Sequence, residues 1–580
     1  MKPNRRLLLF AALAAGLFFL LADPFLSPPD SACYWSWGES LVRDGDFAFL
    51  NQFARFEMPV RYTYITETGR LANDWPPGSG FLLGPWVLIG PMFAHAWVLM
   101  VVAGALAFWA RGAGFSPAAT RWGLLAAIAG TPLAFYVFFG PFFSHALSFA
   151  VVTVFLVLWD RTRGGRPASE AALLGLLLGV ATAIRPQNAL LAAVFLAEVP
   201  GWWRGRTWSP RTVGAWMGAG ALGVVPLLLA YWALYGSPLA LPKTEEMHWL
   251  RPALGRMLFS DFHGVLPWTP VYVLVVAGLA LLARRDRMLA AALGLVLALQ
   301  VYVNAANVVW WSGGSFGNRR LTDYAIVAAW GIAELFRAVE NRPRPQRHAV
   351  LAAIALCCVW SVWLLLAERR LIVPLDRYVP LRGREFAAGM LRVWSEPFQT
   401  LQSVARGPWT AAGIARRTTA ALLAGAGTAA FLALAARLRR SHAPRVMGTG
   451  LVLAGVLALA TAVAALRTPP VEDPELIAAV GTEPGILWDN YIELAFYELR
   501  RGDFVASEEA ARRALAIWDD NDNTWVALGR ALFYQKRWIS ASDAFDRALA
   551  INPESRIALD YRSAASARIA EQTGRLKSED

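Results

Sequence analysis

The chain has little charge and little cysteine, and each shortage excludes a class of protein. Only 17% of its 580 residues are charged, whereas 56% are hydrophobic. A soluble protein is rarely so apolar, and a chain of this length has room for many membrane spans. Its 3 cysteines are too few for a disulfide framework. No spacing of His, Cys, Asp and Glu specifies a metal site, so we expect no metal and no other cofactor.

Apolar runs of about 20 residues predict an all-α, polytopic membrane protein of about 13 transmembrane helices. The first run, 7–22, follows Lys2, Arg5 and Arg6. It could be a cleaved signal peptide, but the further spans favour an uncleaved anchor. The others are 80–110, 122–139, 141–159, 169–184, 187–201, 212–235, 265–283, 288–308, 321–338, 349–367, 418–436 and 446–466.

The net charge of +13 comes largely from alternate connections between these spans. Basic residues in short loops mark the cytoplasmic side of a membrane, so nucleic acid is not needed to explain the charge. The pattern predicts a cytoplasmic N-terminus in a bacterial inner membrane and an extracytoplasmic C-terminus. The basic loops contain Arg111, Arg121, Arg161, Arg163, Arg166, Arg204, Arg206, Arg211, Arg284, Arg285, Arg287, Arg337, Arg342, Arg344, Arg347, Arg437, Arg439, Arg440 and Arg445.

The outside loop 23–79 contains a short amphipathic segment, for which we expect an interfacial helix over 31–44. Tyr34, Trp37 and Leu41 recur at helical spacing, and an aromatic face next to a span favours the membrane interface. Asp30 precedes this helix. It is either a candidate for chemistry at the membrane surface or a helix N-cap. A second interfacial helix is predicted in the outside loop 368–417.

The composition changes after residue 467. We expect a transmembrane domain over 1–467, a linker over 468–485 and a small extracytoplasmic helical-repeat domain over 486–580. Two tetratricopeptide units are 34 residues apart, and such repeats usually hold a protein or peptide, here a partner or an acceptor. The second unit carries the characteristic residues Trp525, Leu528, Gly529, Ala541, Phe545, Ala548 and Pro553.

The order of motifs resembles membrane glycosyltransferases of the C superfold (GT-C), particularly protein O-mannosyltransferases and the aminoarabinose transferase that acts on lipid A. The motifs are PPDSACYWSWGESLVRDGDF from Pro28, NDWPPGSGFLLGPW from Asn73, TPLAFYVFFGPFFSHALSF from Thr131, GLLLGVATAIRPQ from Gly175, FSDFHGVLPWTP from Phe259 and WWSGGSFGNRRL from Trp310. The resemblance implies a membrane enzyme with its active site outside. It also implies inverting transfer of a hexosyl or pentosyl group from a polyprenyl-phosphate carrier to a protein, glycan or lipid.

Asp30 is the general base that this resemblance implies. Protein O-mannosyltransferases carry an Asp-Glu pair at this place, whereas here Ser31 follows Asp30. The donor phosphate needs cations, and arginine suits phosphate oxygens. Arg185, Arg319, Arg320 and the polar His145 are the candidates for donor binding. As alternatives, Arg185 could extend to the lipid headgroups, and Arg319 and Arg320 could anchor at the interface or pair with Asp323. His145 could be a structural hydrogen-bonding residue.

Four further residues of the outside loops are candidates for lining the substrate site. Trp75 and Trp311 could stack on a sugar, although an aromatic belt explains tryptophans at this level equally well. His263 and Asp46 complete the set. Two other functions remain open, a transporter or flippase of lipid-linked sugars and a non-catalytic scaffold for the repeats. The near absence of charge inside the spans favours the enzyme over the transporter.

Overall fold

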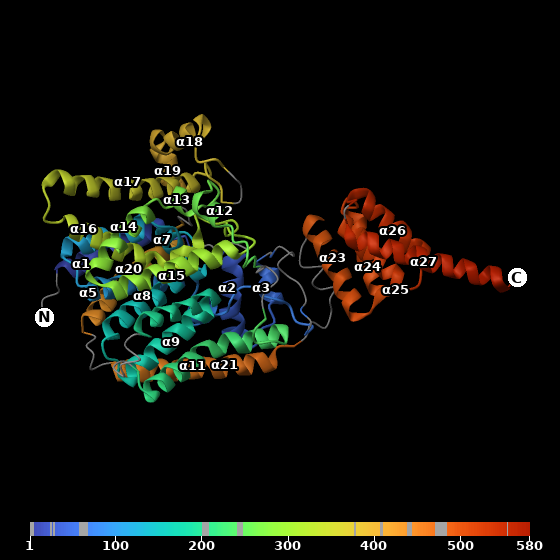
Figure 1. Cartoon of the computed structure of the whole chain (residues 1–580), viewed down its shortest axis with the longest axis horizontal. Coiled ribbons are helices and arrows are strands. Elements are labelled where there is room, and N and C mark those ends of the chain that lie inside the picture. Colours follow the sequence, from blue (N-terminus) through green and yellow to red (C-terminus); the bar gives the residue numbers. More distant parts are fainter. Residues whose placement is uncertain are drawn as a thin grey trace.

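The computed structural model is helical throughout the residues that it describes (Figure 1). It describes 5–23, 26, 29–56, 58, 66, 68–199, 208–240, 247–375, 379–405, 410–437, 443–469, 484–553 and 555–579. Within these ranges the only β-type pairing is an isolated bridge between Met247 and Asn307.

Each segment predicted to span the membrane contains helix among its described residues, and the predicted span 122–139 is interrupted between residues 129 and 133. Six of the described helices are both long and apolar enough to cross a bilayer, and the total number of crossings stays a prediction. The six are α5 (Pro91–Gly112), α8 (Ser144–Thr162), α11 (Pro210–Tyr235), α15 (Arg287–Ala306), α17 (Arg344–Arg369) and Val446–Arg467, which belongs to α21 (Ala443–Arg467). The other predicted segments form α1 (Arg5–Leu21), α6 (Pro117–Ala129), α7 (Leu133–Phe138), α9 (Ala168–Ile184), η3 (Pro186–Glu198), α14 (Val271–Arg285), α16 (Ala325–Val339) and α20 (Ala411–Arg437).

The predicted span 80–110 is divided into two helices, α4 (Gly78–Val87) and α5. Gly90 has a φ of 117°, which is open to glycine but not to other L-residues, and Pro91 then starts the second helix. Because α4 is a short separate helix, it can pack along the outside loop while α5 joins the bundle.

The basic connections meet one another at one end of the bundle. Arg163, after α8, donates to Asp286, which lies between α14 and α15, with 2.8 Å between Nη1 and Oδ1. Ser116, before α6, donates to Glu340, after α16, over 2.8 Å. These contacts place four predicted cytoplasmic connections on the same side of the bundle. The orientation in a membrane stays a prediction, and the connection 201–207 lies outside the described residues.

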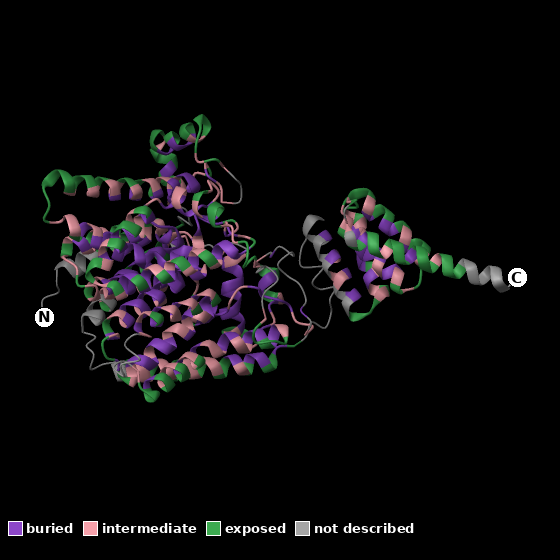
Figure 2. Ribbon diagram, in the orientation of Figure 1, coloured by how far each residue is buried: buried purple, intermediate pink, exposed green. Residues whose placement is uncertain are grey.

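The predicted helix after Asp30 forms, but protein surrounds its residues 31–40 on all sides. It consists of α2 (Asp30–Glu39) and one π-helical turn, η1 (Ser40–Asp44), and ends at Gly45 in the left-handed conformation. Trp37 is completely buried against the rings of Phe47, Phe49 and Phe81. The aromatic face therefore packs into the protein (Figure 2). The prediction that this face lies in the membrane interface is wrong. Burying these large rings is worth more than exposing them to headgroups.

The second predicted interfacial segment does present apolar side chains outward. It forms two helices, α18 (Arg384–Ser395) and α19 (Pro397–Val404). Leu391, Trp394, Phe398 and Leu401 are all exposed on them. Such a face suits a lipid surface, which remains our prediction for these helices.

Among its described residues, the C-terminal part has five helices that pack on their neighbours, drawn in orange to red in Figure 1. Gly529 lies directly under the ring of Phe545, so a side chain at this glycine would collide with the ring. Most of the predicted linker lies outside the described residues. The helices are α23 (Pro484–Arg501), α24 (Phe504–Ile517), α25 (Asp522–Tyr534), α26 (Trp538–Ile551) and α27 (Arg556–Glu579).

Candidate functional site

Asp30 does not cap α2, although it is the first residue of that helix. The N-cap is Pro29, and no side chain caps the helix. The carboxylate turns away from the helix end instead. Its Oδ1 accepts a hydrogen bond from the Trp75 indole N–H over 2.8 Å and lies 3.1 Å from Nη1 of Arg319. The Asp30 and Arg319 side chains are 15% and 16% exposed, so the pair lies at the edge of the interior.

The contact from Trp75 depends on a close crossing of α2 and α4. A Cβ on Gly80 would collide with the Tyr34 carbonyl oxygen, so only glycine allows this approach. The segment before α4 is then held by two further hydrogen bonds. The Trp37 indole donates to the Trp75 carbonyl over 2.7 Å, and the Asn73 amide donates to the Cys33 carbonyl over 3.1 Å.

A second carboxylate, Asp323, lies completely buried behind this pair. Its Oδ1 is 2.9 Å from Nδ1 of His145, which donates to it. Its Oδ2 accepts from the Ser148 hydroxyl over 2.7 Å and lies 3.0 Å from Nε of Arg185. Three donors therefore satisfy the charge, as a buried carboxylate requires.

Arg185 reaches this position because of the proline that follows it. The residue before a proline is forced out of the helical conformation, and α9 accordingly ends at Ile184. Arg185 has φ −150° and ψ 113°, and its buried guanidinium bonds to groups of α8 and η4. Its Nη1 donates to the Ser144 hydroxyl over 3.1 Å and lies 3.4 Å from Nε2 of His145. The side-chain oxygen of Gln187 also accepts from it, in the amide orientation that satisfies both groups.

The two carboxylates belong to one ring of residues, which is closed partly by polar contacts and partly by the backbone of α2 and of η4. The short helix η4 (Arg319–Tyr324) carries both Arg319 and Asp323, so it joins the two ion pairs on one side. On the other side the Ser144 hydroxyl donates to the Tyr34 hydroxyl over 3.0 Å, and Tyr34 lies one turn after Asp30 on α2. Each of the two acids thus faces an arginine, and both pairs are part of a single network.

Polar groups behind the ring hold Ser148 in place. The Asn188 amide donates to Ser148 over 2.8 Å, and the Tyr324 hydroxyl donates to Asn188 over 2.8 Å. Gln300 in turn donates to Tyr324 over 2.9 Å. This chain connects α15 to η4 and α8, so the ring rests on rigid helices rather than on loops.

Aromatic rings form the wall beside the cations. The Arg319 guanidinium lies 5.5 Å from the centre of the Phe143 ring, and the His145 ring lies 4.7 Å from that of Tyr136. The Tyr136 hydroxyl accepts from the Phe316 N–H over 3.0 Å. These rings exclude water, which strengthens every charge interaction next to them.

The remaining candidates lie outside the ring, with one exception. Trp75 belongs to the site through Asp30. His263 donates through Nδ1 to the Trp311 carbonyl over 3.0 Å, and burial lowers the pKa of His263 to about 4. Asp46 accepts from the Ala48 N–H and the Ser40 hydroxyl, both over 3.0 Å, in the turn after α2. These side-chain contacts hold Asp46 within its own turn and join His263 to the loop that contains Trp311.

The sequence reasoning missed the centre of the network. It treated Asp323 only as a partner for Arg319 or Arg320, whereas Arg319 pairs with Asp30 and Asp323 with Arg185. A carboxylate at the start of an apolar segment was the signal available for Asp323. Ser144 and Ser148 gave no such signal, because serine is common at helix starts and in apolar helices. Within the described residues, no three His, Cys, Asp or Glu side chains gather closely enough to hold a metal ion.

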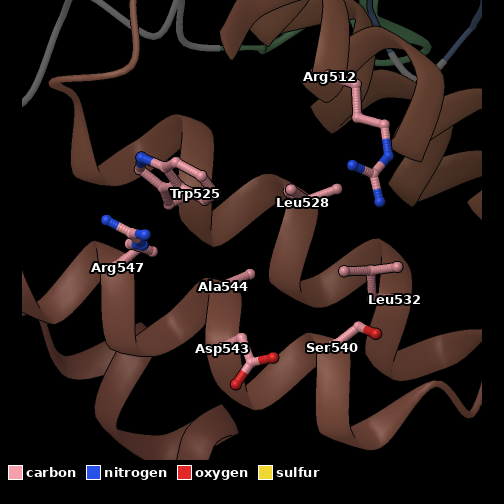
Figure 3. A pocket seen from close by; sticks show the side chains of 8 residues that line it. All are labelled: Arg512, Trp525, Leu528, Leu532, Ser540, Asp543, Ala544 and Arg547. Atoms are coloured by element: carbon pink, nitrogen blue, oxygen red, sulfur yellow. The ribbon is translucent and has the colours of Figure 1, made fainter.

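A separate cavity of about 220 Å³ lies between α24, α25 and α26 (Figure 3). Leucines and Trp525 form its floor, and two arginines lie at its edges together with Asp543 and Ser540. Its lining residues are Arg512, Trp525, Leu528, Leu532, Ser540, Asp543, Ala544 and Arg547.

The chain as a whole is a helical protein with apolar helices of membrane-spanning length and a polar ring buried between α2, α8, α9 and η4. Comparison with known proteins finds no matching family model and no matching curated protein. Among solved structures, it is similar to the crystal structure of ArnT from Cupriavidus metallidurans bound to undecaprenyl phosphate. The sequences are 16% identical, the match covers 84% of this chain and 90% of that one, and the TM-score is 0.43.

Proposed function

We propose that the protein is a glycosyltransferase that moves a sugar from a polyprenyl-phosphate carrier to an extracytoplasmic acceptor, with inversion at C1. One observation carries the proposal: a partly exposed carboxylate, Asp30, lies against an arginine, and a second buried arginine belongs to the same network. A base and phosphate-binding cations are the groups that this reaction requires. The motif order described above supplies the reaction class.

The reaction assigns a role to each group. The acceptor hydroxyl attacks C1 of the sugar and gives its proton to Asp30. The bond between C1 and the phosphate oxygen breaks, and its electron pair goes to the leaving phosphate. Arg319, Arg185 and Arg320 stabilise the charge on that phosphate. His145, whose Nδ1–H is committed to Asp323, contributes by holding Arg185. Trp75, Trp311, His263 and Asp46 are proposed to line the sugar and acceptor side.

The decisive experiment is transfer of labelled sugar from a polyprenyl-phosphate donor in proteoliposomes. We expect transfer by the native protein and a loss of at least about a hundredfold in Asp30→Asn, which keeps the shape but cannot accept the proton. Asp160→Asn is the matched control, because Asp160 also faces an arginine, Arg163, over 3.0 Å on the opposite side of the bundle. Full activity of Asp30→Asn would refute the base assignment. Movement of the donor across the bilayer without transfer would instead indicate a flippase.

We also propose that the C-terminal helices are tetratricopeptide repeats that hold a protein, either the acceptor or a partner of the enzyme. The cavity beside Trp525 supports this, because it combines apolar floor and charged edges in the way that peptide sites do (Figure 3). Deletion of residues 486–580 tests the idea. Transfer to a small soluble acceptor should persist while transfer to the natural protein acceptor falls. If the deletion variant transfers sugar to both acceptors as well as the native protein does, the repeats bind a partner and not the acceptor.

A further inference from the structure

Asp323 is the one carboxylate of the ring to which the proposed reaction gives no task. It lies behind Arg185, completely buried, and three protein donors already occupy its two oxygens. Because it is completely buried, an acceptor hydroxyl cannot reach it to give up a proton. Its effect on the reaction must pass through the groups that it holds, above all Arg185.

The charges of the ring cancel in pairs. Arg319 faces Asp30 over 3.1 Å, and Arg185 faces Asp323 over 3.0 Å. A buried ion pair is costly to form, and a packed apolar pair is often at least as stable. The acid behind Arg185 is thus better explained by the charge that it removes from the site than by the stability that it adds.

The charge of the carrier phosphate changes during the proposed reaction. In the donor the phosphate is a diester with a single negative charge, whereas the released carrier is a monoester with a charge of about −1.5 to −2 at pH 7. Arginines without a balancing acid would therefore bind the product more tightly than the donor. Such a site would be inhibited by its own product.

We propose that Asp323 is a positioning residue that weakens the electrostatic attraction between Arg185 and the carrier phosphate, so that the carrier monophosphate can leave after transfer. This inference rests on the proposed function. Asp323 achieves this by fixing Arg185 through Nε and by orienting His145, whose Nε2 lies 3.4 Å from Nη1 of the same arginine.

The test is Asp323→Asn, which keeps the size of the side chain and removes its charge. Binding of a short-chain polyprenyl monophosphate, and of its methyl phosphodiester, is measured on the purified full-length protein in nanodiscs. We expect about tenfold tighter binding of the monophosphate and a smaller gain for the diester, because the attraction scales with the ligand's charge. In the transfer assay kcat should fall while KM for the donor does not rise. A merely structural defect weakens binding and cannot produce this gain.

Two comparisons complete the experiment. Asp160→Asn, at the other end of α8, makes the same charge change beside Arg163 and should leave both affinities unchanged. In an Arg185→Gln background the Asp323→Asn change should no longer tighten monophosphate binding, since the arginine through which it acts is gone. This double variant removes both charges together, so it also reports on the pair if Asp323→Asn alone does not fold.

Each result decides between the two proposals. Suppose that the native protein transfers sugar, and that Asp323→Asn and the native protein bind the monophosphate equally tightly. The role of Asp323 is then refuted and the proposed function stands. The same holds if Asp323→Asn tightens binding equally with and without Arg185. If the native protein neither transfers sugar nor binds either phosphate, the proposed function is refuted, and so is this inference, which rests on it.

Discussion

Oδ1 of Asp30 lies 3.1 Å from Nη1 of Arg319, so a cation holds the residue proposed as the base. A guanidinium at this distance competes with an acceptor hydroxyl for the lone pairs of Oδ1. A donor phosphate competes for the same guanidinium. If Arg319 turns toward the phosphate, Asp30 is released at the moment when a substrate is present, which protects the site from proton transfer in its absence.

Loss of this arginine should affect donor binding first. We expect Arg319→Gln to raise KM for the donor about tenfold or more, because a buried charge-assisted contact to phosphate is lost. Arg319→Lys should have a KM for the donor between those of the native protein and Arg319→Gln, since lysine keeps the charge but not the planar guanidinium. Arg382→Gln is the control, because Arg382 lies largely exposed beside Asp261. An unchanged KM in Arg319→Gln would mean that Arg319 only pairs with Asp30 and does not bind the donor phosphate.

The contact between Tyr34 and Ser144 should couple the two halves of the ring. Tyr34→Phe and Ser144→Ala each remove the hydrogen bond of 3.0 Å between their hydroxyls. In a double-mutant cycle on kcat/KM we expect a coupling energy of about 1 kcal/mol, the net value of one buried hydrogen bond. Strictly additive effects would mean that the ion pairs of Asp30 and Asp323 act independently.

The close approach of α2 and α4 makes a prediction for stability. Gly80→Ala should lower the free energy of unfolding by about 2 kcal/mol or more, because the new methyl group meets the Tyr34 carbonyl oxygen and the Trp37 side chain. Gly294→Ala, in the middle of α15 with open space around it, should be neutral or slightly stabilising. Thermal unfolding in detergent measures both. Similar melting temperatures for the two variants would contradict the packing.

The sequence predicts the helices well, because hydropathy carries that information locally. Asp30, Arg185, Arg319 and His145 were each singled out from single features such as a membrane-level charge. Which acid meets which arginine was not predictable, since Arg185 and Asp323 are distant in the chain and meet only through the packing of α8, α9 and η4. The burial of α2 was missed for the same reason. The rings that cover Trp37 come from later segments of the chain, such as Phe81 in α4.

The C-terminal helices offer a prediction for pH dependence. Burial raises the pKa of Glu508, but hydrogen bonds from Gln535, Arg512 and Arg537 outweigh this effect, so its pKa lies below the ordinary value. A lowered pKa in the folded state contributes stability above the unfolded pKa of about 4.3, and that stability is lost as the pH falls through the folded value. Glu508→Gln should therefore unfold more easily than the native protein at pH 7. The two should converge in acid, and a constant difference across this range would argue against the shift.

The place where the chain leaves the helical bundle has a consequence for acceptor capture. Thr468, directly after α21, accepts a hydrogen bond from the Phe47 N–H over 2.8 Å and another at its carbonyl from Arg70 over 3.0 Å. The chain toward the C-terminal helices thus starts on the same loop that carries Asp30. About 16 residues separate α21 from α23, which can span at most about 55 Å. A protein bound to the C-terminal helices is therefore tethered close to the site. Its effective concentration there approaches the millimolar range, whatever its concentration in bulk.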